Sequence, residues 1–79
     1  MTIAPNPSHD YFQVVMDESL IDAGPLNVTI YSIDGQAVTS SSRVVNDQIL
    51  STPDIPGMYL IQMVQPATGR HGMEKLVVR

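Results

Sequence analysis

Few side chains in this sequence have the type and spacing that metal binding requires. The two histidines, His9 and His71, lie far apart in the sequence, next to Asp10 and Gly72, and neither has a second ligand at the spacing of a metal site. Zinc and related metals are held where three or four such ligands converge. We therefore interpret both histidines as solvated loop residues rather than metal ligands.

Three acidic residues lie close together, Asp17, Glu18 and Asp22. Calcium takes six or more oxygen ligands, which neighbouring carboxylates can supply. The three residues do not follow the spacing of an EF-hand loop. A solvated acidic loop is therefore favoured, with a calcium site as the alternative.

Nucleophiles and phosphate-binding loops do not occur at catalytic spacing either. The serines concentrate in "TSSSR", residues 39–43, without a GxSxG turn or a nearby base. The glycines fall singly at turns, and the chain has no cysteine. We expect no enzyme activity and no cofactor, and we expect residues 39–43 to form the exposed face of a strand.

Length and charge limit the possible functions further. The chain has 79 residues, 43% of them hydrophobic, so we expect one small domain over residues 1–79 with a thin core. The net charge is −4, and the four basic residues form no dense cluster, which argues against nucleic-acid binding. These basic residues are Arg43, Arg70, Lys75 and Arg79.

Targeting segments are not evident in the sequence. No apolar run approaches the roughly 20 residues of a transmembrane helix. The first ten residues, "MTIAPNPSHD", lack the pattern of a signal peptide. If the domain is exported, we expect it to be a fragment of a larger secreted protein whose upstream part carries the first targeting signal.

Alternation of apolar and polar residues predicts that the elements holding these side chains are strands. Residues 11–16 and 26–33 each place apolar side chains on one face. Phe12, Val14 and Met16 share one face of the first run. In the second run, Leu26, Val28 and Ile30 face one way, and we expect these three in the core. Residues 17–25 break the alternation and predict a loop, with a short helical turn capped by Asp17 as the alternative.

The second half of the chain continues the strand pattern. Asp34 and Gly35 separate two alternating runs and predict a hairpin. A short strand is expected at 48–51, and residues 58–65, apolar on both faces, predict a central strand. A loop at 66–72 and a final strand at 73–79 complete the pattern. The fold class predicted is all-β, a small antiparallel immunoglobulin-like β-sandwich of about seven strands.

The aromatic residues Phe12, Tyr31 and Tyr59 are interpreted first as core or half-buried strand residues. A platform on which sugars stack is the alternative.

Four motifs follow one another along nearly the whole chain. They are Pro5, Asn6 and Pro7; the strand Val28 to Gly35 with its turn at Asp34 and Gly35; Gly57 and Tyr59; and the run Lys75, Leu76, Val77, Val78 and Arg79. Each motif alone is weak. Together and in this order, they resemble the C-terminal sorting domains of proteins exported by the type IX secretion system of Bacteroidetes.

The resemblance implies a function without catalysis. A sorting domain of this kind is an address tag fused to an upstream cargo domain and recognised in the periplasm by the outer-membrane translocon. The cargo then reaches the cell surface or the medium, where a surface sortase typically removes the tag, and many cargos are joined to anionic lipopolysaccharide. The resemblance also implies that residues of the four motifs serve recognition.

The run Lys75 to Arg79 reaches the last residue of the sequence, and we expect it to be an ordered strand. Such a strand offers backbone donors, backbone acceptors and positive charge to a receptor, as in strand addition to a sheet edge. Alternatively, Leu76 and Val78 complete the sandwich while Lys75 and Arg79 protect an edge from aggregation. Both can hold at once.

Two further functions stay open from the sequence. One is an accessory glycan- or protein-binding module of a secreted enzyme. The other is a structural or adhesive sandwich with weak self-association through its edge strands.

Overall fold

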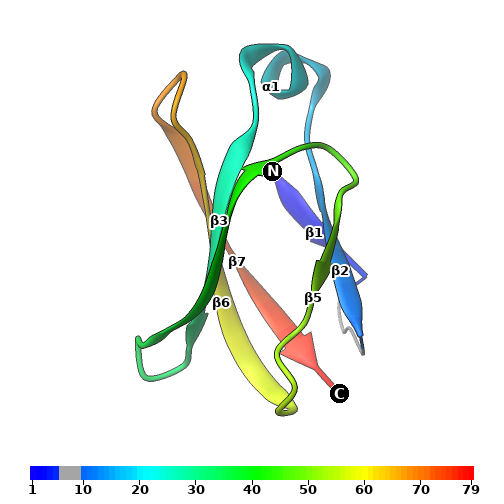
Figure 1. Ribbon diagram of the computed structural model, residues 1–79, viewed down its shortest axis with the longest axis vertical. Helices are drawn as coiled ribbons and strands as arrows, with labels where there is room; N and C mark the ends of the chain where they lie inside the picture. Colours follow the sequence, from blue (N-terminus) through cyan, green and yellow to red (C-terminus); the bar gives the residue numbers. More distant parts are fainter. Residues whose placement is uncertain (6–9) are drawn as a thin grey trace.

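The computed structural model describes residues 1–5 and 10–79, and strands dominate this part of the chain (Figure 1). The elements are β1 (Thr2–Ala4), β2 (Tyr11–Val15), α1 (Glu18–Ala23), β3 (Leu26–Ser32), β4 (Ala37–Val44), β5 (Ile49–Ser51), β6 (Gly57–Gln65) and β7 (Arg70–Val78). They confirm the predicted all-β fold of about seven strands. None of the helical structure in the described residues is long and apolar enough to cross a membrane.

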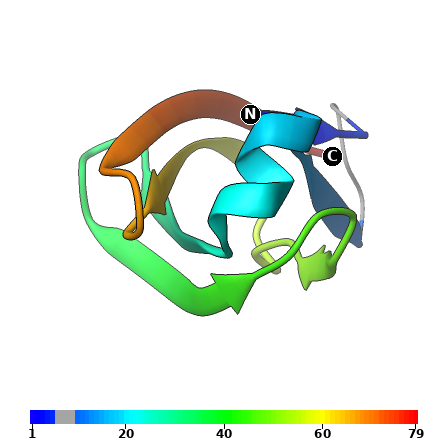
Figure 2. The ribbon, with the colours of Figure 1, turned by 90° about the horizontal axis from the view of Figure 1, so that it is seen from above.

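The strands form two antiparallel sheets that face each other (Figure 1). One sheet has three strands in the order β1-β2-β5, and the other has four in the order β4-β3-β6-β7. The chain changes sheet between β2 and β3, between β4 and β5, and between β5 and β6. Viewed from above, α1 lies across one end of the sandwich (Figure 2). The prediction that β6 is a central strand is confirmed, because it pairs with both β3 and β7.

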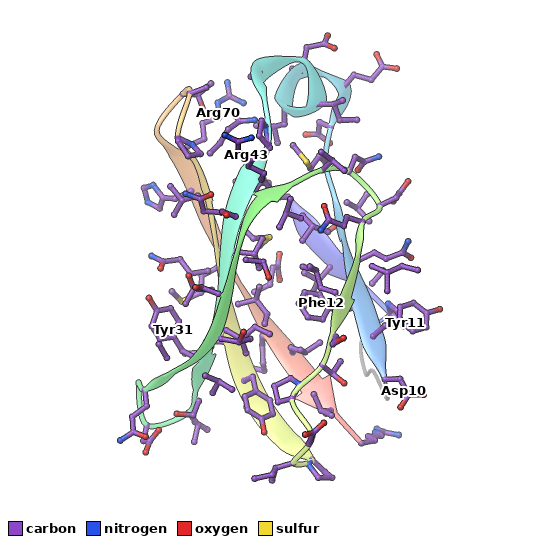
Figure 3. All side chains as sticks on the ribbon, in the orientation of Figure 1. Asp10, Tyr11, Phe12, Tyr31, Arg43 and Arg70 are labelled. Carbon is purple, nitrogen blue, oxygen red and sulfur yellow. The ribbon has the colours of Figure 1, made fainter. Side chains whose placement is uncertain are left out.

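The core lies between the sheets and contains Leu26, Val28 and Ile30, as expected, together with the residues that share one face of β2. Phe12, Val14, Met16, Leu26, Val28 and Ile30 are all buried. The ring of Phe12 points into the space between the sheets, whereas Tyr31 points away from it (Figure 3). Period-two alternation is reliable here because each strand has only one face against the other sheet.

The loop expected at residues 17–25 is instead largely helical, which corrects the favoured interpretation. Helix α1 begins after Asp17, as the alternative had it, but the Asp17 side chain makes no capping hydrogen bond. The Asp17 carbonyl accepts hydrogen bonds from the N–H groups of Leu20 and Ile21, each at 2.9 Å. A six-residue helix is too short to be stable alone. Burial of Leu20 against the end of the core stabilises it.

A fully buried polar side chain, Gln65, ties α1 to the end of β6. Its Nε2 donates to the carbonyls of Leu20 (2.7 Å) and Gly24 (2.8 Å), which lie at the C-terminal end of the helical segment. Its Oε1 accepts from the Thr68 hydroxyl at 2.8 Å, in the turn that follows β6. One amide therefore satisfies helix-end carbonyls that have no partner within the helix.

The two hairpins of the larger sheet differ in how well the sequence predicted them. The hairpin at Asp34 and Gly35 is confirmed, and its loop has three residues, because the Ser32 N–H donates to the Gln36 carbonyl at 2.8 Å. Gly35 has a φ of 91°, which a glycine adopts without steric cost. The loop expected at 66–72 is wrong at its end, since β7 already begins at Arg70.

Replacement of Gln65 by leucine tests the amide bridge. Gln65→Leu keeps the side chain's size but leaves buried carbonyls of Leu20 and Gly24 without their donor, so we expect a loss of about 2 kcal/mol in the free energy of unfolding. Urea unfolding measures this loss. The matched control is Gln36→Leu at an exposed position beside the Asp34 hairpin turn, with an expected change below about 0.5 kcal/mol. Equal effects of the two substitutions would contradict the role given to Gln65.

Candidate recognition site

Residues of three of the four sequence motifs gather at the end of the sandwich opposite α1, which we call the recognition end because the resemblance predicts recognition by these residues. Strand register places Gly57 opposite Val78 and Tyr59 opposite Leu76. Tyr59 also pairs with Ser32, the residue just before the hairpin loop that holds Asp34 and Gly35. The hairpin loop, the start of β6 and the end of β7 therefore share one end of the molecule (Figure 1).

The first motif directly follows β1, whose last residue, Ala4, lies opposite Gln13 in the middle of β2. Strand β1 lies beside β7 across the two sheets. Both strands end on the same side of the molecule (Figures 1 and 2). Pro5 directly follows β1 and is exposed. Asn6 and Pro7, as well as His9, lie outside the described residues.

Strand β7 separates its side chains by alternation. Leu76 and Val78 point inward and are 0% and 4% exposed. Lys75 and Arg79 are exposed, and Val77 is half-buried. The expectation that Leu76 and Val78 complete the sandwich is confirmed. Because β7 is an edge strand of the larger sheet, its basic side chains lie at the border of that sheet.

The Gly57 and Tyr59 motif fixes the start of β6. The Tyr59 ring is 8% exposed, and its hydroxyl donates a hydrogen bond to the Ile55 carbonyl in the loop before β6. Gly57 has a φ of 155°, where a side chain would be strained. The motif therefore holds the strand against which the last residues of β7 pair.

The aromatic residues are core or half-buried, as the first interpretation had it. Phe12 and Tyr59 are buried, and Tyr31 is half-buried with its hydroxyl 3.1 Å from the Gln62 Oε1, to which it donates. Flat exposed rings are what sugar stacking needs. Neither Phe12 nor Tyr59 offers one.

Asp34 organises the hairpin loop at the recognition end. The Ser32 hydroxyl donates to its carboxylate and holds the pKa of Asp34 below its ordinary value, with a backbone hydrogen bond at Gln36 acting in the same direction. The carboxylate is exposed. Asp34 therefore stabilises the shape of the loop and is not a buried charge.

Candidate metal ligands do not assemble in the part of the chain that the structure describes. Its His, Asp and Glu side chains form no group of three that could hold a metal ion. His71 is exposed but lies in β7, so its assignment to a loop was wrong. The serine-rich residues 39–43 lie in β4 and are largely exposed, as expected.

A groove that the sequence analysis missed opens between β4 and β5. Its volume is about 820 Å³, and Val28, Ile30, Val38, Leu50 and Ile55 are among the residues that line it. Thr39 and Ser41 pair with Ile30 and Val28 and line the groove as well. These small side chains fill little space, so the sandwich stays open on that side. In the sequence, the run of serines at residues 39–43 was the feature that could have indicated this groove.

Substitutions along β7 separate its inner face from its outer face. Leu76→Ala removes a fully buried side chain, so we expect a loss of about 3 kcal/mol in the free energy of unfolding. Val77→Ala, one residue on and half-buried, is expected to cost less than about 1 kcal/mol. Urea unfolding of both variants measures the difference. Similar losses would show that the inward and outward assignments are wrong.

The hairpin loop has an expected pH dependence. A depressed pKa in the folded state means that ionised Asp34 stabilises the fold above its unfolded pKa, and that this stability is lost as pH falls through the folded pKa. Wild type should therefore melt at a higher temperature than Asp34→Asn near neutral pH, and the gap should close as the pH falls below the ordinary pKa of an aspartate. A gap that is independent of pH would refute the ionised hydrogen bond.

Comparison with known families identifies nearly the whole chain. The family model described as "Secretion system C-terminal sorting domain" matches residues 2–79. No protein with a curated description matches the chain. The match spans both sheets, from β1 to the last residue after β7. The chain therefore belongs to the family of C-terminal sorting domains of the type IX secretion system.

Proposed function

We propose that the outer-membrane translocon of the type IX system recognises this folded domain in the periplasm through its recognition end, and so carries an upstream cargo to the cell surface or the medium. Family membership supports the sorting role, which implies secretion across the outer membrane. The observation that carries the placement is the alternation on β7, where buried Leu76 and Val78 alternate with exposed Lys75 and Arg79.

This alternation suits a sorting signal that must be folded and, at the same time, present side chains to a receptor. The inward side chains fix β7 in the sandwich, so its outward side chains are held in one arrangement before a receptor arrives. Such preorganisation lowers the entropy cost of binding. Lys75 and Arg79 add positive charge to a domain whose net charge is −4, which gives a receptor a local feature to distinguish.

The later steps follow from the same proposal. After export, a surface sortase removes the domain by cleaving upstream of Pro5, and the cargo is released or joined to anionic lipopolysaccharide. The domain itself performs none of this chemistry. Its cargo determines what the exported protein does.

The test uses a reporter that carries an N-terminal export signal and this domain at its C-terminus. We expect delivery to the surface or the medium in a type IX competent host and retention in a translocon-null strain. Delivery in neither host would contradict the sorting role for this domain.

A charge-matched pair of variants tests the recognition end. The double variant Lys75→Gln with Arg79→Gln should reduce delivery about tenfold, the change expected when a few central contacts are lost. The control, Arg43→Gln with Arg70→Gln, removes the same charge at the end near α1, where both side chains lie (Figure 3). Equal delivery by the two double variants would place recognition elsewhere.

A second candidate function is a peptide-binding module, which the groove between β4 and β5 favours. Its lining is more apolar than polar, with buried Phe12 and Tyr59 among the lining residues beside Ser, Thr and Asp54 side chains. Such a lining suits an extended apolar peptide better than a glycan. Binding of an extended apolar peptide that is lost with Val38→Asp, while delivery of that variant stays at the wild-type level, would favour this function.

A further inference from the structure

The outer face of the four-stranded sheet is more apolar than a solvated sheet face needs to be. Residues 58–65 predicted two apolar faces, and only the inner one is used by the core. Met58 and Met73 are 42% and 55% exposed on the strands β6 and β7. An antiparallel sheet normally turns polar residues toward water on such a face. The apolar side chains here require another explanation.

Strand register brings these side chains into one surface. Tyr31, Leu60 and Lys75 form one row across β3, β6 and β7, since Leu60 pairs with both of the others. Met58 pairs with Val77 in the next row toward the recognition end. Met73 lies on the other side, opposite Gln62. We call this set the outer apolar face: Tyr31, Met58, Leu60, Met73, Lys75 and Val77.

Charge sets this face apart from the rest of the domain. The chain has eight acidic residues, and none lies on the outer apolar face. Seven of them lie outside the strands: Asp10 before β2, three in or beside α1, and three in the connections between strands. The eighth, Glu74, lies on β7 opposite Ile61, on the inward side of the sheet. Lys75 is the charged residue within the face, and His71 lies beyond it on β7. The face is therefore apolar and positive on an acidic domain.

We propose that the outer apolar face docks a folded protein partner that presents apolar side chains around a carboxylate, opposite Lys75. The proposal rests on the sorting function and extends its recognition site from the end of β7 onto the sheet. The positive charge of Lys75 favours a partner that places a carboxylate opposite it. Exposed methionines suit such a surface because their flexible side chains adapt to a partner's shape.

Two other occupants fit less well. A second copy docked on the same face would place one Lys75 near the other without an acid between them. An anionic membrane surface attracts clusters of basic residues, and this face has a single lysine on a domain of net charge −4.

The experiment places one negative charge at matched positions of the same sheet. Met73→Glu is compared with Ser40→Glu, which lies on β4 and is exposed. Both variants are fused to the reporter and measured for delivery in the type IX competent host. We expect Met73→Glu to reduce delivery about tenfold and Ser40→Glu to leave it unchanged. Met58→Glu serves as the second variant if Met73→Glu melts at a clearly lower temperature than wild type.

The possible results separate the two proposals. Wild-type delivery together with full delivery of Met73→Glu and Met58→Glu would overturn the docking face and leave the sorting function standing. Retention of the wild-type fusion would instead count against the sorting function. Flotation with phosphatidylglycerol vesicles, lost in Met73→Glu, would overturn the protein partner in favour of a lipid one. Concentration-dependent dimerisation lost in Met73→Glu would overturn it in favour of a second copy.

Discussion

The pairing of β7 with β6 is the constraint on which the recognition end depends. Tyr59 opposite Leu76 and Gly57 opposite Val78 fix the register, and a shift by one residue would turn Leu76 and Val78 out of the core. The same register sets which side chains of β7 face outward. The register of β7 against β6 therefore determines both the stability of the fold and the outward direction of Lys75 and Val77.

The two ends of the sandwich have different tasks. At one end, α1 and the buried amide of Gln65 close the core and hold the crossing between the sheets. At the other end, the chain brings together segments that are distant in sequence, namely the hairpin loop at Asp34, the start of β6 and the end of β7. This arrangement explains why the family motifs are scattered along the sequence. Three of the four motifs come to the same end of the sandwich only after folding.

The strands, the Asp34 and Gly35 hairpin and the core faces could be predicted from the sequence because they follow local alternation and turn chemistry. Helix α1 could not, since it depends on Leu20 meeting the core and on Gln65, which lies far along the chain. The start of β7 at Arg70 likewise depends on pairing with Gln65 in β6. Alternation showed that β6 is apolar on both faces, but only the sheet order shows that its outer face meets solvent. The groove between β4 and β5 could not be predicted either, because its prediction also requires knowing which strands form the edges of the sheets.

The most direct measurement determines both the free energy of unfolding and the delivered fraction for single substitutions at each position from Lys75 to Arg79. We expect two separate classes. Changes at Leu76 and Val78 should lower stability, whereas changes at Lys75 and Arg79 should lower delivery at nearly constant stability. If delivery instead followed stability across all five positions, β7 would serve the fold alone, and the recognition end would have to be sought on another surface.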